Sequence, residues 1–150
     1  MTRHLHLVTN SRSSWNSLVC VNDQAKREFY FWGDKLRTLN EIFFSPIHFG
    51  LSKVLFTDAS PAGRGGFIQG SALVCHKNWS AKESQKSFTW RELVAINFAL
   101  QAFDNHLAGQ TVPCNTDNQN VFRIIQAGSM VKELQDIALT IFLFTSQRQI

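Results

Sequence analysis

The sequence predicts an α/β fold with a mixed sheet, and three observations support this prediction. Short apolar runs bounded by glycine and proline lie between residues 51 and 80, as expected for strands. Segments of helical periodicity follow, with one more strand between them, and the order strand, strand, strand, helix, strand, helix, helix is typical of an α/β domain. A long helix precedes the fourth strand, so we expect a crossover that makes the first and fourth strands parallel neighbours.

Before this domain, residues 22–44 predict one amphipathic helix. Asn22 is suited to cap its N-terminus, and Gly33 weakens its middle. Apolar residues recur at steps of four, three, four and three, and they form a stripe that must pack on another element: Ala25, Phe29, Trp32, Leu36 and Leu39.

Pro46 and Gly50 then interrupt the pattern and predict a domain boundary near residue 50. The chain therefore divides into an N-terminal helical extension, residues 1–50, and an α/β domain, residues 51–150. The opening stretch "MTRHLHLVTNSRSS" has no continuous apolar run, and it predicts a partly disordered lead-in without a secretory signal.

Within the domain, residues 52–57 predict the first strand, and the glycine-rich stretch "SPAGRGG" predicts a turn. Residues 67–69 and 72–76 predict two further short strands. A long helix is expected over residues 90–107.

A fourth strand is expected at residues 111–116, although Pro113 cannot donate a hydrogen bond to a ladder. Two helices follow, at residues 118–127 and 131–146.

With 150 residues, of which 44% are hydrophobic, the composition permits one domain with a substantial core or a small domain plus an extension. No window approaches the roughly 20 apolar residues that a membrane span requires. The three cysteines have no paired spacing, which argues against a disulfide framework or zinc site and fits a reducing compartment. We therefore expect an intracellular protein, cytoplasmic or nuclear, with no membrane partner. Cys75 and Cys114 are expected to pack in the core, and His4 and His6 to be incidental.

The charge is mildly basic, at +4 with a pI of about 9.2, which is compatible with a polyanionic partner. The basic residues concentrate between residues 77 and 91. Glu83 is the single acidic residue of this stretch, and Trp79 and Trp90 lie among the cations. The cations of this stretch are Lys77, Lys82, Lys86 and Arg91. Two interpretations stay open, a nucleic-acid contact and a solvated loop.

Two carboxylates follow predicted strands that should be adjacent. Asp58 ends the first strand and Asp117 follows the fourth, and function in α/β sheets gathers at the carboxyl ends of strands. If they emerge side by side, their charges repel unless a cation lies between them. Asp58 alone could instead be a turn-former, and Asp117 the N-cap of the next helix.

Glu92 is the third candidate. It shares its side of the predicted helix with Ile96 and Ala99, so it should face the sheet. Its alternative role is local, because Thr89 and Glu92 match a capping box. A carboxylate on the core side needs a partner, and a divalent cation can serve all three carboxylates.

In this order, "LFTDAS…GRGG", "TWRELVAINFAL" and "TDNQNV" resemble the ribonuclease H domain of retroelement reverse transcriptases. The likeness is greatest to the retrotransposon branch, whose members read "TDAS", "WRE" and "TDN" at these places. It spans residues 51–150, and the ordered trio is more specific than any single stretch. "AKREFYFW" is similar to the connection segment between polymerase and ribonuclease H, which implies the polymerase part of a retroelement polyprotein as a partner.

The resemblance implies a sheet of order 3-2-1-4-5 with helices on both faces. It also implies hydrolysis of the RNA strand of an RNA–DNA hybrid by two Mg²⁺ ions about 4 Å apart, which Mn²⁺ can replace. Carried over by motif, Asp58 bridges both ions, and Glu92 and Asp117 hold the ion on the leaving-group side. Ser60 and Asn118 would contact the substrate backbone or its 2′-hydroxyls. The basic stretch would lie along the phosphates of the duplex.

The sequence also departs from the family, which has a fourth carboxylate after a fifth strand. The sequence stops at "LFTSQRQI", where that strand would begin, so we expect a sheet of order 3-2-1-4 with the fifth strand largely missing. We also expect activity to be lost or to depend strongly on the metal. Glu133 and Asp136 fit the solvated face of the last helix. One alternative is a catalytically inactive nucleic-acid-binding or interaction module with the same fold. Another is a polynucleotidyl transferase with Glu133 as its third acid, against which the "TWRE" helix argues.

Overall fold

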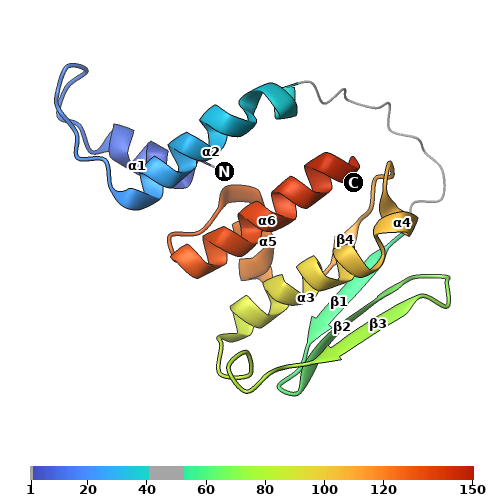
Figure 1. Ribbon diagram of the computed structural model, residues 1–150. Helices are drawn as coiled ribbons and strands as arrows, with labels where there is room; N and C mark the ends of the chain where they lie inside the picture. The colour runs from blue at the N-terminus through green and yellow to red at the C-terminus, as the bar shows by residue number, and fades with distance from the viewer. Residues whose placement is uncertain (1, 41–52) are drawn as a thin grey trace.

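The computed structural model describes residues 2–40 and 53–150 (Figure 1). Its strands are β1 (Leu55–Ala59), β2 (Gly63–Ile68), β3 (Val74–Asn78) and β4 (Cys114–Asn115). Its helices are α1 (Arg3–Asn10), α2 (Asp23–Asn40), α3 (Phe88–Ala102), α4 (Asp104–Leu107), α5 (Gln119–Ala127) and α6 (Lys132–Arg148).

The strands form one mixed sheet of order β3-β2-β1-β4, which confirms the predicted α/β class and strand order. β1 pairs antiparallel with β2, and β2 antiparallel with β3. β1 and β4 are parallel, with Leu55 opposite Cys114 and Phe56 opposite Asn115. Pro113 precedes β4 and accepts a hydrogen bond of 2.9 Å from the Leu55 N–H, so the ladder uses its carbonyl and needs no N–H from it.

The predicted glycine-rich turn is wrong in part, because β2 begins inside it at Gly63. These glycines allow close approach within the sheet. A Cβ at Gly63 would lie 2.8 Å from the Lys77 carbonyl oxygen. A Cβ at Gly66 would lie 2.9 Å from the Ala99 Cβ and 2.9 Å from the Phe56 carbonyl oxygen, so α3 rests close on the sheet there.

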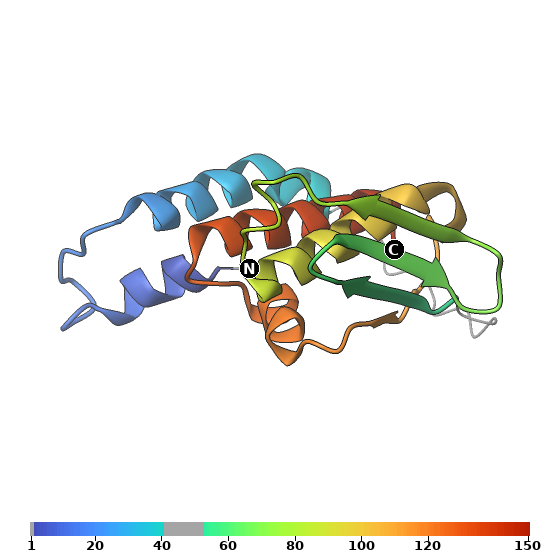
Figure 2. The ribbon, with the colours of Figure 1, turned by 90° about the horizontal axis from the view of Figure 1, so that it is seen from below.

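The helices are layered on one face of the sheet (Figure 1). α3 lies along β1 and β2, and α6 packs on α3 with α5 beside it. α2 lies beyond α6, where Arg27 is 3.4 Å from Asp136 and the rings of Trp32 and Phe142 are 5.9 Å apart. Figure 2, turned by 90°, shows α2, α6 and α3 side by side behind the strands.

The other face of the sheet is open in the described part of the chain. Phe56 and Phe67 stack on it with ring centroids 5.0 Å apart, and Phe67 and Val74 are exposed. The expectation of helices on both faces is therefore not met among these residues.

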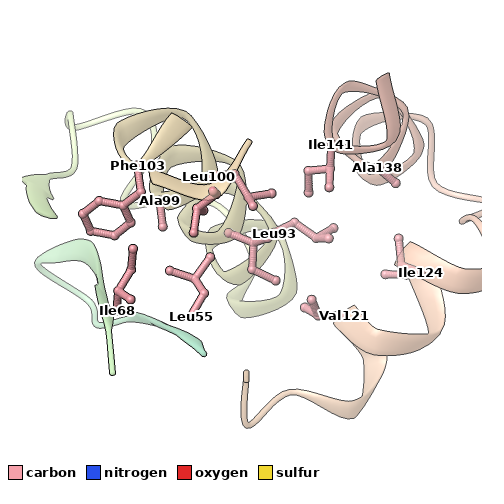
Figure 3. Close-up of a cluster of buried hydrophobic side chains, with 12 residues drawn as sticks. Leu55, Ile68, Leu93, Ala99, Leu100, Phe103, Val121, Ile124, Ala138 and Ile141 are labelled. Atoms are coloured by element: carbon pink, nitrogen blue, oxygen red, sulfur yellow. The ribbon is translucent and has the colours of Figure 1, made fainter. Parts of the chain in front are cut away.

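The core lies between this sheet and the helices (Figure 3). Leu55 points from β1 towards Leu93 and Leu100 of α3, and Ile68 points from β2 towards Phe103. Further buried side chains extend the core to α5 and α6 and to the end of α3: Ile96, Ala99, Phe103, Leu107, Val121, Ile124, Ala138 and Ile141. Cys75 packs against this cluster, as predicted, whereas Cys114 in the two-residue strand β4 is exposed.

The helix predicted from residue 22 is confirmed as α2, and Asn22 Oδ1 caps it by accepting a hydrogen bond of 2.9 Å from the Ala25 N–H. The predicted stripe is wrong in part. Ala25 is buried, but Phe29 and Leu36 are exposed, and Glu28 takes an inner position. The Leu39 side chain and the boundary near residue 50 lie outside the described residues.

The expected lead-in is wrong, because Arg3–Asn10 form helix α1. Glu28 holds this helix by its free N–H groups: Oε1 accepts from His4 N at 3.2 Å and Oε2 from Leu5 N at 2.9 Å. His4 is only 3% exposed, and its Nε2 lies 3.2 Å from the Ser129 carbonyl oxygen. His4 therefore has a structural role, and the expectation that it is incidental is wrong. His6 is exposed.

Candidate metal centre

The first carboxylate of the site lies near the end of β1. Side chains alternate along this strand, so Thr57 and Ala59 are buried and Asp58 is exposed. Asp58 pairs with Gly65, which pairs in turn with His76. Because Gly65 has no side chain, the surface beside Asp58 is hollowed, and a hollow of about 270 Å³ is lined by Asp58, Ser60, Ala62, Gly63, Arg64, Gly65, His76, Lys77 and Asn78.

The second carboxylate follows β4, the parallel neighbour of β1. Asp117 is exposed and is not the N-cap of α5. Asn118 is the cap, and its Oδ1 accepts from Asn120 N at 2.9 Å and Val121 N at 3.3 Å. The local alternative for Asp117 is thus wrong. The side chain predicted for substrate contact at Asn118 is buried and already holds the helix.

The third carboxylate belongs to α3 and is fully buried. Ser87, not Thr89, caps this helix by accepting a hydrogen bond of 3.2 Å from Trp90 N, so the predicted capping box does not form. Glu92 Oε1 instead accepts a hydrogen bond of 3.2 Å from Ala59 N. Glu92 Oε2 is buried and has no hydrogen-bond partner. A buried carboxylate oxygen without a partner indicates a missing cation or donor.

The three carboxylates meet where β1, β4 and α3 converge. Asp58, Glu92 and Asp117 each offer an oxygen, and these atoms lie within 4.8 Å of one another. Burial is the largest cause that raises the pKa of Glu92, to about 7, and the charges of Asp58 and Asp117 raise it further. The Ala59 N–H and the Arg91 guanidinium lower the same pKa.

No cation of the described residues forms an ion pair with this cluster. Every other acidic residue that the structure describes has a partner. These pairs are Asp23 with Lys26, Asp34 with Lys35, Glu83 with Arg64, Asp104 with Arg148, Glu133 with Lys86, Asp136 with Arg27, and Glu28 with the N-terminus of α1. The cluster is therefore the unneutralised acidic site of this part of the chain.

The residues predicted to bind nucleic acid are spread around this site. Ser60 Oγ holds the β1–β2 turn, where it accepts from the Ala62 and Gly63 N–H groups and donates to the Gly63 carbonyl. The Ser60 carbonyl accepts from Arg91 Nη1 at 3.3 Å.

Among the lysines, Lys77 and Lys82 are exposed, and Lys77 lines the hollow beside Asp58. Lys86 pairs with Glu133 and lies 5.7 Å from the centre of the Trp90 ring. Two of the predicted cations thus already have protein partners, and a contact of these residues with nucleic acid stays a prediction.

Arg64 is a residue of this region that the sequence did not single out, because it lies in the stretch interpreted as a turn. Its Nη1 is 3.0 Å from Glu83 Oε1, and its guanidinium lies 4.6 Å from the Trp79 ring centre and 5.2 Å from that of Phe98. Hydrogen bonds from Ser80 and the neighbouring Arg64 hold the pKa of Glu83 at about 2. This pair fixes the loop between β3 and α3.

Carboxylate oxygens are the ligands that Mg²⁺ and Mn²⁺ prefer. The donor set of Asp58, Glu92 and Asp117, with its unpartnered oxygen and repelling charges, fits such an ion. Within residues 2–40 and 53–150, none of the helices combines the length and apolar character that crossing a membrane would require.

The fold and the site define an α/β domain with a candidate acidic metal centre. Comparisons of the chain with protein-family models, with curated proteins and with solved structures returned no significant match.

Proposed function

We propose that residues 51–150 form a ribonuclease H-like domain of a retroelement reverse transcriptase, which hydrolyses the RNA strand of RNA–DNA hybrids with Mg²⁺. The observation that carries this proposal is the cluster of Asp58, Glu92 and Asp117, whose oxygens lie within 4.8 Å of one another without a cationic partner. Two-metal phosphodiester hydrolysis uses such a cluster, because its carboxylates hold the divalent ions that stabilise negative charge on the phosphate.

The motifs and the topology support the same proposal. "TDAS" places Asp58 on β1, "WRE" places Glu92 on α3, and "TDN" places Asp117 after β4. The proposed covalent partner is the polymerase part of a retroelement polyprotein, to which the segment with α2 would connect.

The two exposed carboxylates and the buried one have different tasks in this proposal. Asp58 and Asp117 face the substrate side, and Glu92 is held in place by the Ala59 N–H. Mg²⁺ bound by the three would activate water and stabilise charge on the phosphate oxygens. Mn²⁺ would serve as a substitute.

The test is cleavage of a labelled RNA–DNA hybrid by the purified chain, first in Mg²⁺ and then in Mn²⁺. Asp58→Asn keeps the size of the side chain and removes its charge, so we expect cleavage to be lost. Asp34→Asn is the matched control, since Asp34 is exposed on α2 and pairs with Lys35. Cleavage by Asp58→Asn at the wild-type rate would refute the assignment.

The second candidate is a catalytically inactive nucleic-acid-binding or interaction module with the same fold. The ribonuclease H domains that the sequence resembles have four carboxylates at this site, whereas the cluster has three among the described residues. This difference favours the inactive module. Glu133 and Asp136 pair with Lys86 and Arg27 and do not join it. A wild-type chain that binds the hybrid but cuts it in neither metal would establish this candidate.

A further inference from the structure

The side of α2 that faces away from α1 and α6 is uncovered in the described part of the chain, and α2 lies at the edge of the molecule (Figure 1, Figure 2). Phe29, Tyr30 and Leu36 are exposed on this side, by 63%, 70% and 58%. The rings of Phe29 and Tyr30 lie edge to face with centroids 6.0 Å apart, and Leu36 lies two helical turns beyond Phe29. A group of large exposed side chains marks an interaction surface. We call this exposed side, between Asp23 and Arg37, the outer face of α2.

Gly33 lies within the outer face and has no structural reason in the single chain. It is exposed, its backbone is helical, and a Cβ at this position would meet nothing within 4 Å. Glycine in the interior of a helix is destabilising relative to alanine. A position without a side chain allows a second backbone to approach closely, and this use of Gly33 is left open by the contacts that the structure describes.

The charges on the outer face are arranged symmetrically about Tyr30. Asp23 lies seven residues before Tyr30 and Arg37 seven residues after it, whereas Lys26 lies four residues before it and Asp34 four residues after it. Each of the two pairs combines opposite charges. If two copies of α2 pack antiparallel with Tyr30 at the centre, Asp23 therefore lies opposite the partner's Arg37, and Lys26 opposite the partner's Asp34.

The same charges argue against a parallel arrangement, which would place each of them beside its own copy. They are also available for a partner. Arg37 forms no ion pair within the described residues. The side chains of Asp23 and Asp34 are 92% and 73% exposed, although they lie near Lys26 and Lys35. The charge pattern thus fits a dimer with twofold symmetry, in which both copies use the same surface.

We propose that the outer face of α2 binds the outer face of α2 in a second copy of this chain, antiparallel and centred on Tyr30. Phe29 and Tyr30 supply the apolar contact, and Gly33 lets the two helices approach. One face of one helix is smaller than the surface that a stable dimer buries, so we expect a weak dimer with a Kd in the micromolar range or above. The inference does not depend on the proposed ribonuclease activity.

The first test is sedimentation equilibrium of the purified chain over a range of concentrations. A reducing agent keeps the exposed Cys20 and Cys114 from forming disulfides. We expect the average mass to rise with concentration from that of the 17.1 kDa chain towards twice that mass. Tyr30→Asp should weaken the association about tenfold or more, because an aromatic side chain at the centre of an interface carries much of its affinity. Phe122→Asp is the matched control, since Phe122 is an exposed aromatic residue of α5.

The second test exchanges charges across the proposed dimer. Lys26→Glu places two acidic groups opposite each other at both ends, and Asp34→Lys does the same with two cations. Each should weaken association about three- to tenfold, since two exposed pairs are lost in each dimer. The two substitutions together restore opposite charges and should restore the wild-type affinity. In the control, Asp34→Lys is combined with Lys82→Glu, which gives the same net charge as the exchanged pair but lies in the loop before α3 and should not restore it.

Thermal melting of each variant establishes that the fold is retained. A wild-type chain that stays monomeric at every concentration would overturn the inference, and so would wild-type association in Tyr30→Asp. An equal loss in Phe122→Asp would also overturn it, since the contact would then not be specific to α2. Failure of the exchanged pair to restore association, or equal restoration by Lys82→Glu, would overturn the antiparallel arrangement.

Discussion

The backbone N–H of Ala59 donates a hydrogen bond of 3.2 Å to Glu92 Oε1, and so joins the strand that carries Asp58 to the helix that carries Glu92. This one contact sets two carboxylates from different elements side by side. It satisfies one oxygen of Glu92 and leaves the other buried without a partner. The metal-free protein therefore contains an ionisable group whose charged form is disfavoured.

The first prediction concerns the stability of the metal-free protein. The pKa of Glu92 is raised from 4.5 to about 7, so the folded state binds more protons than the unfolded state between these values. Stability should then fall as pH rises through this window, by about 3 kcal/mol from this group. Glu92→Gln has no charge to bury, so it should be more stable than the wild type at pH 8 in EDTA, with the difference vanishing near pH 4.5.

Urea unfolding at the two pH values measures this difference. A larger deficit of the wild type at pH 4.5 than at pH 8 would contradict it. Asp58→Asn removes one of the charges that raise the pKa of Glu92. The stability of this variant should therefore fall less between pH 4.5 and pH 8 than that of the wild type.

The second prediction concerns the metal. A ligand that binds only the folded state at one hundred times its Kd stabilises by about 2.7 kcal/mol. For a domain of this size we expect Mn²⁺ or Mg²⁺ to raise Tm by about 5 to 10 °C at that saturation. Asp117→Asn should abolish the increase, and Asp34→Asn should retain it. An equal increase in all three proteins would place the ion elsewhere.

The third prediction concerns helix α1. Glu28→Ala leaves the N–H groups of His4 and Leu5 without their acceptor, which costs about 1 to 3 kcal/mol for each group that stays buried. We expect α1 to detach before the domain unfolds, with a loss of amide exchange protection at residues 4–10. Asp23→Ala, on the exposed start of the same helix α2, should leave protection unchanged. Protected amides in Glu28→Ala would show that other contacts hold α1.

The fourth prediction concerns the capping role of Asn118. As the N-cap of α5 it should cost about 1 kcal/mol when replaced by alanine, and much less when replaced by aspartate or serine, which also cap. Chemical unfolding of the three variants tests this order. If Asn118→Ser is as unstable as Asn118→Ala, the hydrogen bonds to Asn120 and Val121 do not account for its position.

The parallel pairing of the first and fourth strands and the meeting of the carboxylates could be predicted from the residues, whereas the full sheet order was implied by the resemblance. Strand-end positions fixed Asp58 and Asp117, and helical periodicity placed Glu92 on the inner side. The start of β2 could not be predicted, because a glycine-rich stretch predicts a turn. Only the folded structure shows that Gly66 lies against Ala99 and Phe56 within the sheet. Helix α1 was missed for a similar reason: the partners of its polar residues, Glu28 and Ser129, are distant in sequence.

Gly66 meets the Ala99 Cβ and the Phe56 carbonyl at a distance that leaves no room for a methyl group. Over evolutionary time this contact would restrict how the chain can diverge. A lineage that gains alanine at position 66 is expected to shift the β1 backbone at Phe56 and, unless position 99 changes as well, to lift α3 away from the sheet. Lifting α3 would carry Glu92 away from Ala59. Retention of the carboxylate cluster therefore depends on the small side chains at positions 66 and 99.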